Sequence, residues 1–278
     1  MNNYIRNYPR PQLIRKQWKN LNGEWKFYYG DEEKPLIRSI KVPFTYETKA
    51  SGIGDETVHS SVWYEKDVIL DANEINRKRV LLHFEGSDYI TTVWVNHCRV
   101  GEHIGGYERF SFDITDYVKP EENNIRVRVR DGLSMAQPRG KQRWKEENFG
   151  CWYVQTTGIW KTVWLEYVPK TYLSHVKMTP DVKNSALHLE YEISFPEGYD
   201  ASMLTVGAEV FMDGCLVARN TVGVSGAETR TTLDLEQQNI SNPQTVHLWT
   251  PENPNLYDIT FTVFENGRAV DQVWSYFG

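Results

Sequence analysis

The chain has 278 residues, of which 40% are hydrophobic and 24% charged, and its formal net charge is -6. This acidic balance argues against a nucleic-acid-binding protein, which needs a basic surface to neutralise phosphates. No run approaches the roughly 18 to 20 apolar residues that span a bilayer, and the start lacks the apolar core of a secretory signal. The sequence therefore predicts a cytoplasmic protein without membrane contact, and its length predicts about two domains.

Short strands fill the first part of the chain. Alternation with period two, between Gly, Asp or Asn residues, predicts strands over 23–30, 61–70, 79–86, 88–96, 107–118, 123–131 and 158–168. Asn96-His97 is expected to form a hairpin turn, because Asn tolerates a positive φ. The row of Arg126, Arg128 and Arg130 alternates with apolar residues, so it is interpreted as a solvated or acid-paired sheet face rather than a binding site.

After Pro169 the pattern changes to about seven strands at roughly ten-residue spacing. Asp213-Gly214 and Asn266-Gly267 mark hairpin turns between them. This strand count is typical of an immunoglobulin-like sandwich. The sequence thus predicts an all-β protein with one β domain over 1–169 and an immunoglobulin-like β-sandwich over 170–278.

A long segment without alternation, residues 132–151, separates the last two strands of the first domain. Loops of this length inside a compact domain are usually functional or disordered, and the aromatic residues argue for order. Sugars stack on aromatic rings and bind amide, carboxylate and guanidinium groups. The candidate substrate-binding residues are therefore Arg139, Gln142, Asn148, Trp152 and Tyr153.

A second interpretation stays open for the same loop: its rings fasten the loop to its own domain. From Gly158 onward, Trp160 and Trp164 lie on a predicted strand, so their rings are expected to be structural.

No catalytic motif stands out. The sequence contains no G-x-S-x-G, H-E-x-x-H or phosphate-binding glycine loop. Its three cysteines are widely separated and form no C-x-x-C pair, which argues against a disulfide framework and a zinc site. We predict no catalytic residue, no metal site and no cofactor for this chain.

Six segments in order carry a family resemblance: "YPRPQLIRKQWKNLNGEWKF", "VPFTYETKASGIG", "VWYEKDVIL", "VWVNHCRVGEHIGGYERFSFDIT", "QPRGKQRWKEENFGCWYVQTTGIWKTVWLEYV" and "LWTPENPNLYDITFTV". They resemble the N-terminal two domains of glycoside hydrolase family 2, the family of β-galactosidases, β-glucuronidases and β-mannosidases. The resemblance covers nearly the whole chain.

The resemblance implies a jelly-roll sugar-binding domain over 1–169, an immunoglobulin-like sandwich and then a TIM barrel, which this chain is expected to lack. The barrel would be the chain's partner and would carry both catalytic glutamates, so the chain alone is predicted to be inactive on its carbohydrate, a β-glycoside. Asn73-Glu74 is the only Asn-Glu pair, and it lies in a polar connection, so no catalytic role is carried onto it.

In some relatives an acidic residue six positions before the Gly-Ile of this motif touches the sugar, and here Trp152 holds that place. Family members often form dimers or tetramers, so the resemblance also implies a homo-oligomer. We therefore interpret the chain as the non-catalytic N-terminal part of a retaining β-glycosidase. The alternative is a self-standing carbohydrate-binding module.

Overall fold

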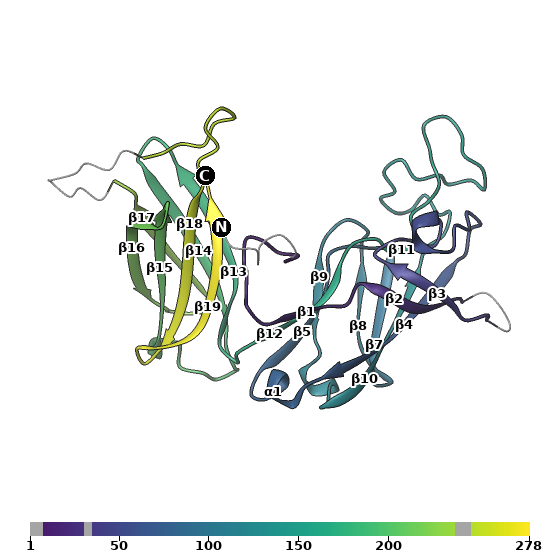
Figure 1. Cartoon of the computed structure of the whole chain (residues 1–278), viewed down its shortest axis with the longest axis horizontal. Helices are drawn as coiled ribbons and strands as arrows, with labels where there is room; N and C mark the ends of the chain where they lie inside the picture. The colour runs from purple at the N-terminus through teal and green to yellow at the C-terminus, as the bar shows by residue number, and fades with distance from the viewer. Residues whose placement is uncertain (1–7, 31–34, 237–245) are drawn as a thin grey trace. The chain divides into compact units, whose positions relative to one another are not determined.

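The computed structural model describes residues 8–30, 35–236 and 246–278 (Figure 1). The fold is all-β, as predicted, with antiparallel pairing between the strands. It divides into two compact units, residues 17–167 and residues 168–278, and residues 8–16 pack with the second. In the described part of the chain no helix has the length and apolar character that a bilayer crossing needs.

The first unit has two main sheets and a short strand pair. The six-stranded sheet has the order β3-β2-β4-β10-β7-β8, the four-stranded sheet the order β1-β12-β5-β9, and β11 pairs with β6. The strands are β1 (Trp18–Asn20), β2 (Gly23–Tyr29), β3 (Arg38–Val42), β4 (Ser61–Leu70), β5 (Arg79–Phe84), β6 (Ser87–Asp88), β7 (Ile90–Val95), β8 (Cys98–Ile104), β9 (Phe110–Asp113), β10 (Glu121–Arg130), β11 (Gly158–Ile159) and β12 (Val163–Val168).

The alternating sequence pattern sets which residues form the core of this unit. On β10 the residues Ile125, Val127 and Val129 are buried, and the arginines between them face outward, as predicted. Hairpin β7–β8 turns at Asn96 and His97, whose φ angles are 48° and 69°, so this turn is also confirmed.

The second unit is a sandwich of seven strands among its described residues. Its sheets have the orders β13-β14-β17 and β16-β15-β18-β19. The strands are β13 (Tyr172–Asp181), β14 (Ala186–Ser194), β15 (Leu204–Met212), β16 (Cys215–Gly223), β17 (Glu228–Asp234), β18 (Tyr257–Glu265) and β19 (Arg268–Phe277). Asp213 and Asn266 have φ angles of 51° and 50° at the predicted turns. Phe261 is fully buried between the sheets.

The segment before β1 belongs to this second unit through a buried ion pair. Arg15 Nη2 lies 2.8 Å from Asp271 Oδ2 and donates to the Leu173 carbonyl at 2.6 Å. Ile14 also forms an antiparallel bridge with Trp274 of β19. Since both charged side chains are only 4% exposed, the pair fastens the segment to the sandwich.

Four short helical turns accompany the strands in the described part of the chain. They are α1 (Ala72–Ile75) and the 3-10 turns η2 (Lys49–Ser51), η3 (Thr115–Tyr117) and η4 (Ala201–Met203). Asp71 and Glu74 form a capping box around α1: Asn73 N donates to Asp71, and Asp71 N donates to Glu74. The Asn73-Glu74 pair is thus part of a helix cap.

Candidate functional site

The long loop between β10 and β11 is tied at both ends to one buried carboxylate. Asp131 Oδ1 accepts from Gly132 N and from Gln137 Nε2, both at 2.7 Å, and Thr157 Oγ1 donates to Asp131 Oδ2 at 3.1 Å. Arg139 Nη2 lies 3.4 Å from Asp131 Oδ1. Figure 1 shows the loop extending beyond the strands beside β11. Because its two ends share one acceptor, they are held together.

A second carboxylate holds the middle of the loop. Gln142 Nε2 donates to Asp88 Oδ2 at 2.6 Å, and Gln142 Oε1 accepts from Thr156 N at 2.8 Å. Tyr107 Oη lies 3.2 Å from the same Gln142 amide nitrogen. Asp88 lies on β6, so Gln142 connects the loop to the short β6–β11 pair.

The loop folds back on itself near Arg143. The Arg143 N–H donates to the Tyr153 carbonyl at 2.6 Å, and the Tyr153 N–H donates to the Lys141 carbonyl at 2.9 Å. The Arg143 side chain is buried and donates to Gln155 Oε1 at 2.9 Å. The segment is therefore ordered by its own hydrogen bonds, as its aromatic content suggested.

Aromatic rings gather at the far end of the loop. Phe149 and Trp152 stack with centroids 5.2 Å apart and an interplanar angle of 16°. Trp144 meets Phe149 edge-on at 4.9 Å, and the Lys145 ammonium lies 4.5 Å from the Phe149 centroid. Tyr153 follows this cluster with 59% of its surface exposed. The cluster thus presents aromatic surface to solvent while holding its own shape.

Two carboxyl groups beneath the loop have raised pKa values. Burial raises the pKa of Asp88 to about 6, although the Gln142 hydrogen bond opposes the shift. Burial raises the pKa of Glu47 to about 7, against hydrogen bonds from Thr45 and Thr157. Asp88 Oδ1 and Glu47 Oε2 are buried, and neither atom has a hydrogen-bond partner among the described residues. Burial therefore disfavours the charged form of both groups.

The sequence did not point to these acids. Asp88 is only the first residue of the predicted strand 88–96, and Glu47 lies far from the loop in the chain. The one available signal is an acid next to a predicted strand that is otherwise apolar, because such a group must find a partner or change its pKa.

The five predicted sugar-binding residues lie in different settings. The Arg139 side chain is buried, and its Nε donates to the Ser134 carbonyl at 2.5 Å. Gln142 is half-buried in the bonds described above. Asn148 is exposed and accepts from Arg143 Nη1 at 3.3 Å. Trp152 and Tyr153 are the two aromatic residues of the five. The Trp152 side chain is half-buried, and the Tyr153 side chain is exposed.

The strand that follows the loop uses its rings differently. Trp164 is fully buried and donates from Nε1 to Glu85 at 2.9 Å. Trp160 is half-buried and donates from Nε1 to the Gly106 carbonyl at 2.8 Å. The prediction that the rings after Gly158 are structural is confirmed for the buried Trp164.

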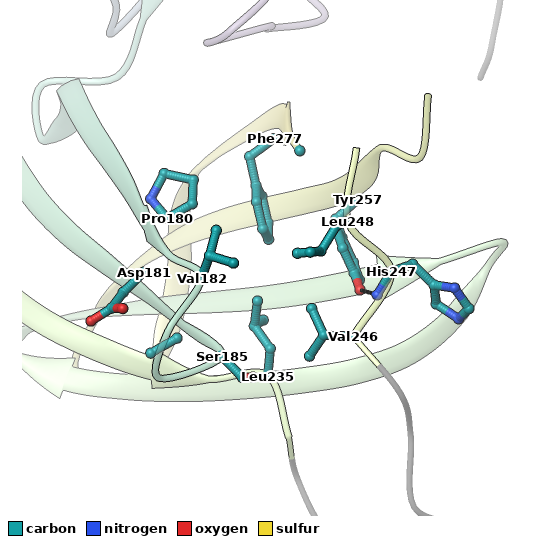
Figure 2. A pocket seen from close by; sticks show the side chains of 12 residues that line it. Pro180, Asp181, Val182, Ser185, Leu235, Val246, His247, Leu248, Tyr257 and Phe277 are labelled. Carbon is teal, nitrogen blue, oxygen red and sulfur yellow. Dashed lines mark hydrogen bonds between the residues drawn. The ribbon is translucent and has the colours of Figure 1, made fainter. Parts of the chain in front are cut away.

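Described residues of the second unit line a small hollow near its C-terminal strand (Figure 2). Its volume is about 40 Å³, and Leu235, Tyr257 and Phe277 point into it. Pockets that bind small molecules usually have volumes of about 300 to 1,000 Å³, so the hollow is too small for a sugar ring. This hollow is therefore not a candidate sugar site.

The two units together define an all-β protein in which a jelly-roll domain with a long aromatic loop is followed by an immunoglobulin-like sandwich. Residues 23–169 match the glycosyl hydrolases family 2, sugar binding domain, and residues 171–278 match glycosyl hydrolases family 2. The chain belongs to this family. Membership associates it with carbohydrate, as predicted.

Curated relatives agree with this assignment. A putative beta-glucuronidase of Formosa agariphila is 31% identical over 276 residues, which cover 96% of this chain and 31% of the relative. A beta-galactosidase of Thermoanaerobacter pseudethanolicus is 27% identical over 264 residues, which cover 91% of this chain and 32% of the relative. The chain thus spans about a third of the length of these relatives and corresponds to their N-terminal, non-catalytic domains.

Solved structures share the fold. Bifidobacterium dentium beta-glucuronidase complexed with coumarin-3-O-glucuronide superposes with a TM-score of 0.75 at 18% identity, over 96% of this chain and 49% of that one. A family 2 member from Bacteroides cellulosilyticus gives a TM-score of 0.70 at 21% identity, over 94% of this chain and 36% of that one. At these identities the likeness concerns the fold alone.

Proposed function

We propose that this chain is the N-terminal part of a retaining β-glycosidase of the β-glucuronidase or β-galactosidase type, and that its loop 132–157 contributes contacts to the sugar site. The single observation that carries the proposal is that accessible aromatic rings lie on a loop whose backbone is held by hydrogen bonds. Tyr153 and Trp152 offer ring surface, and Asp131, Gln142 and Arg143 hold the backbone beneath them. When a sugar face stacks on such rings, the protein loses little side-chain rotamer freedom.

In this proposal the chain binds and positions the sugar, and a barrel outside these residues performs the chemistry. A retaining glycosidase needs two carboxyl groups about 5 to 5.5 Å apart, one as acid/base and one as nucleophile. Asp131 accepts hydrogen bonds from both ends of the loop, and Asp88 accepts from its middle. Both acids are thus engaged in hydrogen bonds with the loop, which supports a structural role for them.

The test is a turnover and binding assay on the purified chain with aryl and methyl β-glucuronides and β-galactosides. We expect no turnover and only weak, millimolar-range binding, because a subsite without its other walls buries little of a ligand. Turnover that persists through an independent second purification would contradict the proposal. Submillimolar affinity for a simple glycoside would favour the alternative, a self-standing carbohydrate-binding module.

A further inference from the structure

The outer face of the six-stranded sheet carries aromatic residues where a solvated sheet face usually carries polar ones. Tyr28 on β2, Trp63 on β4 and Trp94 on β7 lie on this face, opposite the core residues of the same strands. Trp63 stacks on Tyr28 with centroids 6.0 Å apart and lies 5.4 Å from Trp94. All three rings are half-buried, so they form a continuous aromatic strip that remains in contact with solvent.

Arginines of β10 lie along this strip. The Arg126 guanidinium is 4.1 Å from the Trp63 centroid, and that of Arg128 lies 5.4 Å from Trp63 and 5.6 Å from Trp94. These distances are within the range of cation–π attraction. A guanidinium that stacks on a ring keeps the N–H donors along its edge for a planar acceptor.

The charges on the strip are not balanced. Arg126 pairs with Glu65 at 3.0 Å, and Glu102 serves both Arg99 at 3.6 Å and Arg130 at 3.5 Å. Arg128 has no ion pair among the described residues, and its buried Nε has no hydrogen-bond partner. Among the described residues, Glu65 and Glu102 thus form the ion pairs of Arg99, Arg126 and Arg130, whereas Arg128, between the two tryptophans, forms none and only its charge acts on Glu102.

We propose that this outer face is a second binding surface of the jelly-roll domain, which takes a uronate-containing oligosaccharide with Arg128 as its carboxylate contact. The planar guanidinium edge matches a carboxylate through two parallel hydrogen bonds. The rings beside it suit the apolar face of a sugar unit. The small excess of positive charge, on a chain of net charge -6, fits a sparsely charged glycan better than a dense polyanion. The surface is separate from the loop and goes beyond the proposed function.

The test is a titration of the 278-residue chain with a trimer of galacturonate, monitored by calorimetry and by tryptophan fluorescence. A neutral trisaccharide is titrated in parallel. We expect the uronate trimer to bind and the neutral one to bind at least about tenfold more weakly. Arg128→Gln should weaken uronate binding about tenfold or more, and Arg128→Lys should weaken it too, because an ammonium cannot form the bidentate contact. Circular dichroism confirms that each variant is folded.

Lys26→Gln is the matched control, because Lys26 lies on the same sheet face, carries the same charge and pairs with Asp67 at 2.9 Å. It should change uronate affinity less than about twofold. Equal losses in Arg128→Gln and Lys26→Gln would overturn the proposal, as would absence of uronate binding by the wild-type chain. Tighter binding of a thymidine oligonucleotide or of triglutamate would also overturn it. A loss of uronate binding in Tyr153→Ala as large as that in Arg128→Gln would place the contact in the loop and would overturn the proposal.

Discussion

Asp88→Asn should remove a pH-dependent cost of folding from the jelly-roll unit. Burial, with a smaller contribution from Asp131, raises the pKa of Asp88 to about 6, and the Gln142 hydrogen bond and Arg139 act in the opposite direction. An unfolded aspartate titrates near 3.9. Because the folded pKa is the higher one, the folded state binds the proton more tightly. The stabilisation of the folded state by this proton is complete below about pH 4 and is lost as the pH rises to about 6.

The size of this effect follows from the shift. One pKa unit corresponds to about 1.4 kcal/mol, so the free energy of unfolding should fall by about 2 to 3 kcal/mol between pH 4 and 6 because of Asp88. An asparagine at this position can still accept from Gln142, and its amide replaces the buried oxygen that has no partner. At pH 7.5 Asp88→Asn should therefore be more stable than the wild type by about 1 to 3 kcal/mol.

The assay is urea unfolding at several pH values, followed by tryptophan fluorescence. Eight of the ten tryptophans lie in residues 17–167, so the signal reports mainly on the jelly-roll unit. Asp67→Asn is the control, since hydrogen bonds from Asn124 and Lys26 lower the pKa of this exposed acid and its effect has the opposite sign. The reasoning is refuted if Asp88→Asn loses as much stability between pH 4 and 6 as the wild type, or is the less stable of the two at pH 7.5.

Three further substitutions test packing. Arg15→Ala leaves Asp271 buried without its cation, so it should destabilise the sandwich unit by about 3 to 5 kcal/mol, seen as a lower urea midpoint by circular dichroism. Gly158→Ala should lower the free energy of unfolding by about 3 kcal/mol or more on the same readout. The φ angle of Gly158 is 96°, and the new methyl group would lie 2.1 Å from Tyr64 Oη. A stable variant would show that the backbone can move. Phe261→Ala should lower the free energy of unfolding by about 3 to 5 kcal/mol through a cavity, and a loss below about 1 kcal/mol would mean that the core collapses around it.

The sequence predicted the strands and their faces because burial on one side of a sheet imposes a period of two. On β10 this pattern identified the buried residues and the outward arginines, and the Asn96-His97 turn followed from the backbone preference of Asn. The tryptophans beside those arginines come from other strands. Their contact depends on strand order and register, which local periodicity does not specify.

The loop also combines a feature that the local sequence predicts with contacts that it does not predict. Its order could be predicted from its aromatic content, but its support could not, because Gln142 binds an acid 54 positions away in the chain. Arg15 and Asp271 are 256 positions apart, and no local pattern indicates that they meet. Long-range polar contacts of this kind are specified by the whole fold.

The central claim is that the loop contributes to a sugar site, and the most direct measurement is the KM of loop variants in a protein that joins this chain to a family 2 catalytic barrel. Tyr153→Ala and Trp152→Ala should each raise KM for an aryl β-glycoside about tenfold, as expected for the loss of one stacking contact. Met135→Ala, in the same loop and 70% exposed, should change KM less than about twofold. Unchanged KM in both ring variants, or an equal rise in Met135→Ala, would contradict the account.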